Sequence, residues 1–286
     1  MVSQQLKSCN VILGSSSPLG SFLKQNIENV YSFGRSNAIY NFDLNTFSSK
    51  ESTLSDKFQS TNLIEDLKRF DNINIYFIWY SDSNSEILFI QEFLKIVPDV
   101  KVNIIFMSSF SVYGPITSST LNENYPLNPT NLYSQNKLNV EIFLLEMTKL
   151  YPKLSVLILR IPCLVGNNAK HNFLSKLHSN IQRQHPVNLS FITYKFNSVT
   201  DFTEVMNVSD YFIKNQLNKN RYLIFNLASS EFVVFEDFFK SFGYKITESK
   251  NSWGNPPTYV DLSYLNEFEY YPNQTYTVLK EYFNFD

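Results

Sequence analysis

The strongest constraint on the fold is the order of elements predicted for the first 35 residues. Residues 10–13 form a short, mainly apolar run that stops at Gly14, as a buried strand would. A loop that ends at Gly20 follows, and residues 21–27 then have the pattern of an amphipathic helix. A second strand is predicted over residues 29–33. Strand, helix and strand in this order indicate a βαβ unit with parallel strands.

The same alternation continues through the first half of the chain. Further strands are predicted at 73–79, 102–107 and 155–159, and helices at 63–70, 86–96 and 134–150. Strands that alternate with helices predict an α/β protein with a doubly wound parallel sheet.

After Gly166 the pattern becomes less regular, with helices predicted at 172–181 and 207–216 and a strand at 222–227. We expect a main domain over residues 1–165 and a smaller, partly interleaved substrate lobe over residues 166–286. The chain has no linker rich in glycine or proline, so this boundary is soft and some segments of the lobe are expected to return to the main domain.

Charge and cysteine content narrow the class of protein. The 24 Lys and Arg residues nearly balance the 26 Asp and Glu residues, which favours a small-molecule partner over a nucleic acid or a membrane. Cys9 and Cys163 are too few and too far apart for a disulfide framework or a cysteine zinc site, and no metal site is predicted. The sequence shows neither a signal peptide nor an apolar run long enough to span a membrane. We therefore expect a soluble protein of the reducing cytoplasm.

The loop between the first strand and the first helix has the composition of a phosphate-binding turn. Its free N–H groups at the start of the helix can bind a pyrophosphate, and Pro18 suits the first helical turn because its missing N–H would have no partner there. The middle position, often a third glycine, is Ser17, which leaves less room for the phosphate. A tight turn without a ligand is the other interpretation of this spacing. The candidate dinucleotide contacts are Gly14, Ser16, Ser17, Pro18, Leu19 and Gly20.

The residue after the second strand bears on the choice of dinucleotide. An acidic residue there would accept hydrogen bonds from the ribose 2′-hydroxyl of NAD, but this chain has Arg35. The charge and the fork of donors of a guanidinium suit the 2′-phosphate of NADP. The sequence favours NADP(H) over NAD(H), and a surface arginine without a ligand remains the alternative.

Tyr133 and Lys137 lie four residues apart at the start of a predicted helix, so both side chains emerge on one face. An ammonium near a phenol lowers the phenol pKa, which would let Tyr133 act as a general acid or base. The apolar strand before this helix ends in a run of hydroxyl residues that includes Ser109 and Ser111. Ligands of open α/β sheets bind at the carboxyl ends of strands, so these hydroxyls are candidates for substrate contact.

Together these residues resemble the extended short-chain dehydrogenase/reductase family, the branch of NAD(P)-dependent nucleotide-sugar epimerases, dehydratases and 4-keto reductases. The resemblance spans most of the chain and implies a Rossmann sheet. Five of the 7 glycines fall on its motifs. The residues that carry it are the Gly14 loop, Asp43 and Leu44, Ser108 to Gly114, Glu123, Pro126, Pro129, Tyr133 to Lys137, Arg160 to Pro162, Gly166, and Phe225 to Glu231.

By position, the resemblance implies catalytic roles for three residues: Ser109 as the catalytic hydroxyl, Tyr133 as the acid/base, and Lys137 as the ribose-binding ammonium. It also implies an adenine contact at Asp43 and Leu44. Trp79 and Tyr80 stand where the family usually has two small residues, a departure that would reshape the nicotinamide side of the pocket. The remaining implied contacts are Pro162 to the cofactor and Ser109, Phe110, Ser111 and Asn172 to the substrate, while the nearby His171 and Lys176 read as solvated surface residues.

Smaller features favour one reaction among those of the resembled family. Dehydratases carry an acidic pair after the catalytic hydroxyl, but Phe110 and Ser111 occupy those positions here. Epimerases mostly retain NAD, whereas reductases exchange NADPH, so Arg35 favours NADPH-dependent reduction of a nucleotide-linked 4-keto sugar, in the making of a deoxysugar for a surface polysaccharide. A nucleotide-sugar 4-epimerase is the first alternative. A non-catalytic NADP sensor or scaffold is the second, and a homodimer stays open.

Overall fold

The computed structural model describes residues 8–41, 63–80, 85–97, 99–169, 172–185, 187–189, 192–248 and 258–285. Asp43, Leu44 and His171 lie outside the described residues. The chain divides into two compact units, and each is built from separate segments. The first unit comprises Met1–Val112, Pro129–Leu159 and Ser209–Ile224, and the second comprises Tyr113–Asn128, Arg160–Val208 and Phe225–Asp286. The predicted role of residues 166–286 as a substrate lobe stays a prediction.

A seven-stranded sheet organises the fold, and its strand order confirms the doubly wound parallel architecture. The chain starts in the middle of the sheet, builds outward to one edge and then crosses back to build the other half. The carboxyl ends of the parallel strands therefore meet at one edge. In spatial order the strands are β12 (Tyr222–Asn226), β7 (Leu154–Ile161), β5 (Lys101–Ser109), β4 (Asn72–Phe77), β1 (Ser8–Leu13), β2 (Val30–Gly34) and β3 (Tyr40–Asn41).

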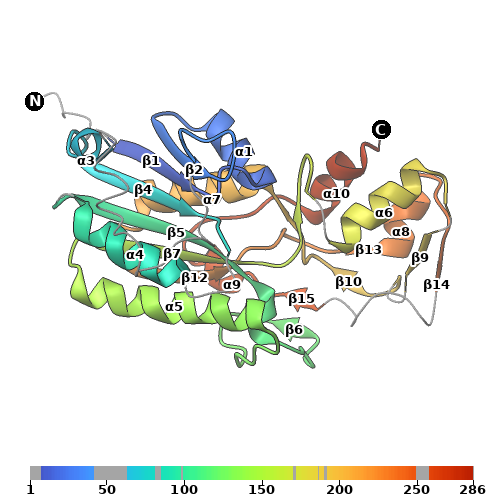
Figure 1. Cartoon of the computed structure of the whole chain (residues 1–286). Helices are drawn as coiled ribbons and strands as arrows, with labels where there is room; N and C mark the ends of the chain where they lie inside the picture. Colours follow the sequence, from blue (N-terminus) through green and yellow to red (C-terminus); the bar gives the residue numbers. More distant parts are fainter. Residues whose placement is uncertain are drawn as a thin grey trace, which may run out of the picture. The chain divides into compact units, whose positions relative to one another are not determined.

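Helices cover both faces of this sheet in the first unit. One face carries α3 (Leu63–Leu67), α4 (Ser85–Ile96) and α5 (Leu132–Leu150), and the other carries α1 (Pro18–Asn26) and the end of α7 (Phe202–Asn215) (Figure 1). None of the helices in the described ranges is long and apolar enough to cross a membrane. The face under α3, α4 and α5 is a continuous apolar core whose members include Val11, Leu13, Phe33, Ile75, Phe77, Phe89, Phe93, Ile104, Phe106, Val140 and Leu144.

A row of three amide side chains crosses the sheet. Asn10, Asn74 and Asn103 are register partners on β1, β4 and β5. The Asn103 amide donates to Asn74 at 2.8 Å, and the Asn74 amide donates to Asn10 at 3.1 Å. The Asn10 amide in turn donates to the main-chain oxygen of Glu28 at 2.8 Å. Because Asn74 and Asn103 are buried, these bonds replace hydrogen bonds to water for Asn74 and for the amide nitrogen of Asn103, whereas the Asn103 Oδ1 has no hydrogen-bond partner among the described residues.

The second unit contains short paired strands and four helices among its described residues. Its strand pairs are β6 (Thr120–Leu121) with β15 (Tyr259–Val260), β8 (Leu164–Val165) with β11 (Thr200–Asp201), β9 (Val187–Leu189) with β14 (Ile246–Glu248), and β10 (Lys195–Phe196) with β13 (Val233–Val234). Its helices are α6 (Phe173–Gln182), α8 (Phe235–Ser241), α9 (Ser263–Asn266) and α10 (Thr275–Phe283). Aromatic rings fill the core between α6, α8 and α10, which is where many of the chain's 26 Phe residues are used.

Most predicted elements of the first unit occur within a few residues of their expected bounds, and the differences have local causes. The strand expected to reach Trp79 ends at Phe77, because the N–H groups of Ile78 and Trp79 both turn to the Leu13 carbonyl. The helix expected from residue 207 begins at Phe202, because the Asp201 side chain accepts the N–H of Glu204 at 2.7 Å and caps the helix.

Candidate active site

The loop from β1 to α1 is a tight turn at the carboxyl end of a central strand. Gly14 has a φ of +101°, and a side chain there would lie 2.9 Å from the Trp79 ring. Gly20 lies even closer to the turn, since a Cβ atom on it would be 2.2 Å from the Gly14 carbonyl oxygen. Both glycines are therefore required for α1 to begin this close to the end of β1. The turn presents the helix N-terminus, the feature that binds a dinucleotide pyrophosphate in folds of this kind.

Ser17 has a structural role in this turn. Its hydroxyl accepts the N–H of Gly20 at 3.0 Å and donates to the Gly14 carbonyl at 2.7 Å, so it is the N-cap of α1. Pro18 occupies the first turn of α1, as predicted. The Ser17 hydroxyl is thus committed to the loop itself, and the predicted crowding of a phosphate by this residue stays a prediction.

Arg35 lies beside this loop at the end of β2. The residue before it, Gly34, approaches the loop so closely that a Cβ atom would be 2.4 Å from the Ser16 hydroxyl oxygen. The residue after it, Ser36, exchanges two hydrogen bonds with the same Ser16 hydroxyl, at 2.8 and 3.0 Å. Arg35 itself is exposed. The structure therefore places Arg35 next to the candidate pyrophosphate turn, where the ribose of a dinucleotide lies in this fold.

Ser109 and Tyr133 meet at the carboxyl end of β5. Tyr133 lies in the first turn of α5, whose start is fixed by a capping box between Asn131 and Ser134. The Ser109 hydroxyl forms a hydrogen bond with Tyr133 that lowers the pKa of the phenol. Ser111 donates to the Ser109 oxygen twice, through its hydroxyl at 3.0 Å and its N–H at 3.2 Å. Three hydroxyls predicted from two separate motifs thus form one connected group.

Lys137 lies one turn after Tyr133 and is only 3% exposed. Its ammonium donates to the main-chain oxygens of Met107 at 2.9 Å and Trp79 at 3.3 Å, and it lies 6.0 Å from the centre of the Tyr133 ring. Burial lowers the pKa of Lys137 to about 8.

The sequence predicted that this ammonium lowers the pKa of Tyr133. In the structure Tyr133 is 37% exposed, yet partial desolvation of its phenol raises its pKa above the usual value, and the Ser109 hydrogen bond opposes the rise. The expected direction was wrong for this arrangement, because the Lys137 ammonium faces the ends of β4 and β5 and is engaged by main-chain oxygens.

Trp79 and Tyr80 stand at the end of β4 and fill space next to the candidate catalytic group. The Trp79 ring packs edge-on against Phe89, at 5.3 Å between ring centres, as part of the apolar core. The Tyr80 ring packs against Tyr133 at 4.7 Å. Tyr80 is therefore an aromatic neighbour of the candidate acid/base, a contact that the sequence alone does not reveal.

Asn172 and Pro162 belong to the second unit. Asn172 is the N-cap of α6: its side chain accepts the Ser175 N–H at 2.8 Å and donates to the Leu164 carbonyl at 2.9 Å. Pro162 directly follows β7 and is half-buried. The predicted contacts of Asn172 with a diphosphate, and of Pro162 and Phe110 with ligands, stay predictions.

Several residues of the resembled motifs form a structural network in the second unit instead of a catalytic group. The buried Arg160 guanidinium donates to the Tyr113 hydroxyl at 2.9 Å, and that hydroxyl donates to the Asn226 side chain at 2.7 Å. The Glu123 carboxylate accepts the Asn226 N–H at 2.7 Å. This network explains why the four residue types occur together in widely separated motifs. Within the described ranges no group of His, Cys, Asp and Glu residues is arranged to hold a metal ion.

The sheet order and the turn after β1 define an α/β protein of the dinucleotide-binding class. The model of the NAD dependent epimerase/dehydratase family matches residues 83–227, half of the chain, and the chain belongs to this family of enzymes. No curated protein sequence matches the chain.

Solved structures of nucleotide-sugar epimerases share this fold over nearly their whole length. UDP-glucose 4-epimerase from Thermotoga maritima, solved with UDP-glucose, has a TM-score of 0.68 at 16% identity and covers 96% of this chain and 97% of that chain. The UDP-Glc/GlcNAc 4-epimerase of Campylobacter jejuni has a TM-score of 0.65 at 17% identity and covers 96% of this chain and 98% of that chain. UDP-glucuronic acid 4-epimerase from Bacillus cereus, solved with UDP-glucuronic acid and NAD, has a TM-score of 0.66 at 18% identity, with 96% and 98% covered.

Proposed function

We propose that the protein is a nicotinamide-dependent oxidoreductase that acts on a carbonyl or hydroxyl group of a nucleotide-linked sugar. The observation that carries this proposal is the joined group of Ser109, Tyr133 and Lys137 at the carboxyl ends of β4 and β5, in a chain of the NAD dependent epimerase/dehydratase family. Such hydroxyls suit a carbonyl oxygen that gains or loses a proton as hydride moves to or from its carbon.

The protein residues have separate roles in this proposal. The bound dinucleotide supplies or accepts the hydride. Tyr133 donates a proton to the sugar oxygen during reduction and takes it back during oxidation, and Ser109 donates a second hydrogen bond to the same oxygen. Lys137 contributes positive charge close to the phenol. The turn from Gly14 to Gly20 would hold the pyrophosphate.

NADPH-dependent reduction of a 4-keto sugar is the form of this activity that Arg35 favours. Its guanidinium is exposed beside the Ser16 loop, where it can meet a 2′-phosphate, and the chain offers it no acidic neighbour in the loop or at the end of β2. Phe110 and Ser111 stand where dehydratases of the family carry an acidic pair, so these residues disfavour dehydration.

Epimerisation at C4 of a nucleotide sugar is the second candidate. The family match and the folds of the C. jejuni and B. cereus 4-epimerases support it. An epimerase would keep its dinucleotide through each cycle, whereas a reductase consumes one NADPH per product.

The two forms differ in what the reaction mixture shows. With a 4-keto nucleotide sugar, a reductase oxidises NADPH in step with product formation, which its absorbance reports. An epimerase instead interconverts two 4-hydroxy sugars with no net change in absorbance. Mass spectrometry of nucleotides that copurify with the protein would identify the sugar class. If neither activity appears with a panel of nucleotide sugars while NADPH binds tightly, a sensor or scaffold role replaces the enzymatic one.

A further inference from the structure

A cluster of three buried charged side chains lies behind the candidate catalytic group. Lys137 is 3% exposed, and Glu86 and Glu141 are each 2% exposed. Glu141 lies on α5 one turn beyond Lys137, so both side chains leave the same face of the helix. Glu86 comes from the first turn of α4, the helix that packs beside α5. Burying a carboxylate destabilises the fold unless hydrogen bonds or an opposite charge compensate for its lost hydration, so the burial of Glu86 and Glu141 requires an explanation.

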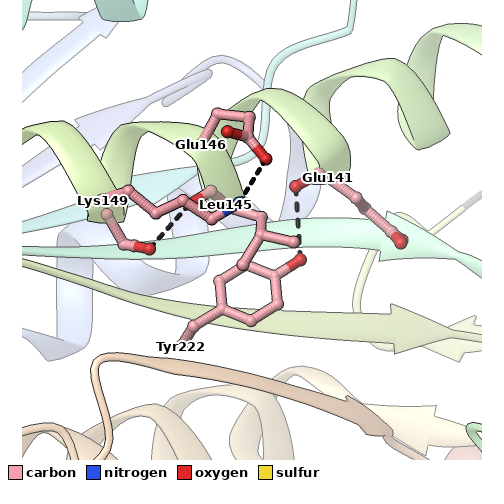
Figure 2. A network of polar contacts seen from close by, with 6 residues as sticks. Glu141, Leu145, Glu146, Lys149 and Tyr222 are labelled. Carbon is pink, nitrogen blue, oxygen red and sulfur yellow. Dashed lines mark hydrogen bonds and ion pairs between the residues drawn. The ribbon is translucent and has the colours of Figure 1, made fainter.

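The contacts of Glu141 attach it to the strand that carries the candidate catalytic serine. Its carboxylate accepts a hydrogen bond from the Ser108 hydroxyl, the residue directly before Ser109. Its main-chain oxygen accepts the Tyr222 hydroxyl at 3.2 Å, and Figure 2 shows its side chain directed away from Tyr222. The side chain of Glu141 is thus hydrogen bonded to β5, and its main-chain oxygen is hydrogen bonded to β12.

The described contacts of the Lys137 ammonium are with uncharged groups. It contacts the carbonyls of Trp79 and Met107 and lies 4.7 Å above the centre of the Phe106 ring. Among the described residues, Glu86 on α4 and Glu141 on the same helix act on the charge of this ammonium, and the centre of the Tyr133 ring lies 6.0 Å from it. Both carboxylates raise the pKa of Lys137, against the stronger lowering by burial.

We propose that Glu86 and Glu141 are positioning residues that keep Lys137 charged in its buried site and aligned with Ser109 and Tyr133. Two carboxylates from different helices supply the opposite charge that an ammonium needs away from water. The Ser108 bond adds a mechanical link, because it ties the Glu141 side chain to the end of β5. This inference deepens the proposed function and rests on it, since Lys137 serves that function only as an ammonium.

The protonation of Lys137 can be measured without any turnover. Protein labelled with ¹³C at the lysine side chains is titrated by NMR, and the Lys137 signal is identified by its loss in Lys137→Arg. We expect a midpoint near 8 in the wild type. Glu141→Gln and Glu86→Gln should each lower the midpoint, and the double variant should lower it further. A midpoint lowered by about one unit would reduce the charged fraction at pH 8 roughly fivefold.

Two further variants separate charge from structure. Glu146→Gln removes an exposed carboxylate of the same helix that pairs with Lys149 at 2.7 Å, and it should leave the Lys137 midpoint unchanged (Figure 2). Glu141→Asp retains the charge, so its midpoint should stay closer to that of the wild type than the midpoint of Glu141→Gln. Equal midpoints in wild type, Glu86→Gln and Glu141→Gln would overturn the proposal, as would an Asp variant that behaves like the Gln variant.

The kinetic readout then tests the link to function. In Glu141→Gln, loss of turnover should begin at a lower pH on the alkaline side than in the wild type, whereas Glu146→Gln should follow the wild type. Midpoints that shift as expected in a protein without any nucleotide-sugar activity would refute the proposed function and leave the charge cluster standing. Midpoints that do not shift in an active enzyme would refute the charge cluster alone.

Discussion

The Ser111 hydroxyl donates a hydrogen bond to the Ser109 hydroxyl oxygen over 3.0 Å, and the Ser111 N–H donates to the same oxygen over 3.2 Å. Both acceptor positions of the Ser109 oxygen are then occupied, because a hydroxyl oxygen has two lone pairs. The proton of Ser109 is left to point toward Tyr133 or a substrate oxygen. Ser111 thus holds the Ser109 oxygen, while the contact with substrate that the sequence predicts for Ser111 stays a prediction.

Ser111→Ala should therefore lower turnover about two- to tenfold, the effect of losing one hydrogen bond, with little change in the substrate KM. Ser111→Thr retains the hydroxyl and should retain most activity. Steady-state kinetics with the true substrate make the comparison. A raised KM with unchanged turnover would instead show that Ser111 binds substrate directly.

Tyr133→Phe should lower turnover by about 10²- to 10⁴-fold while the fold and dinucleotide binding persist, since only the proton-transferring hydroxyl is removed. Ser109→Ala should also lower turnover. Because the two hydroxyls are hydrogen bonded, the double variant should lower turnover by a smaller factor than the product of the two single factors. Single-turnover rates and dinucleotide titrations measure both quantities. Full activity in Tyr133→Phe would exclude this mechanism.

Lys137→Met should cost more than Tyr133→Phe in total, because it removes the buried ammonium and leaves Glu86 and Glu141 without their counter-charge. We expect turnover, NADPH affinity and thermal stability to fall together. Calorimetric unfolding alongside the NADPH titration tests this, and a stable variant with normal NADPH affinity would place the ribose contact elsewhere.

The sequence predicted the first unit well because its signals are local. The strand at Asn10 to Leu13, the Pro18 helix start and the Tyr133 helix each depend on residues close together in the chain, where pattern and capping decide the outcome. The second unit was predicted less completely. Its short strands pair residues far apart, such as Tyr259 with Thr120, and two-residue strands have no periodicity to detect.

In the candidate site too, features that depend on neighbouring residues were predicted and features that depend on packing were not. The spacing of Tyr133 and Lys137 was visible in the sequence, but the buried carboxylate of Glu86 comes from another helix and resembles an ordinary first-turn acid. The direction of the Tyr133 pKa was missed because burial depends on packing, which the sequence does not give. Asn172 was expected to meet a substrate, and its role as a helix cap could have been inferred from Ser175 three residues later.

Arg35→Asp should shift preference from NADPH toward NADH, since a carboxylate accepts hydrogen bonds from a ribose 2′-hydroxyl and repels a 2′-phosphate. Arg69→Asp, at another exposed arginine of the same unit, controls for the change in net charge. Fluorescence titrations with both dinucleotides give the ratio of affinities. Equal binding of NADH and NADPH by the wild type would contradict the assignment of Arg35.

Gly20→Ala should weaken dinucleotide binding and also destabilise the fold, by about 1–3 kcal/mol. The added Cβ atom would meet the Gly14 carbonyl oxygen at 2.2 Å and the Ser15 Cα at 2.8 Å, so the turn itself would have to move. Ser21→Ala, on the exposed side of the same helix turn, should leave thermal unfolding and binding unchanged. A Gly20→Ala variant as stable as the wild type would mean that the turn opens without cost.

The amide row across β1, β4 and β5 has a consequence for how the strands find their partners during folding. Half of the other residues of these strands are Val, Ile or Phe, whose side chains do not by themselves specify one alignment. A slip of β4 by one residue would turn Asn74 into the apolar face that holds Ile73 and Ile75. A slip by two would keep the face but separate Asn74 from Asn10 and Asn103, and a buried amide left unpaired costs about 1–3 kcal/mol. The three asparagines thus raise the free energy of sheets in which β1, β4 and β5 pair out of register.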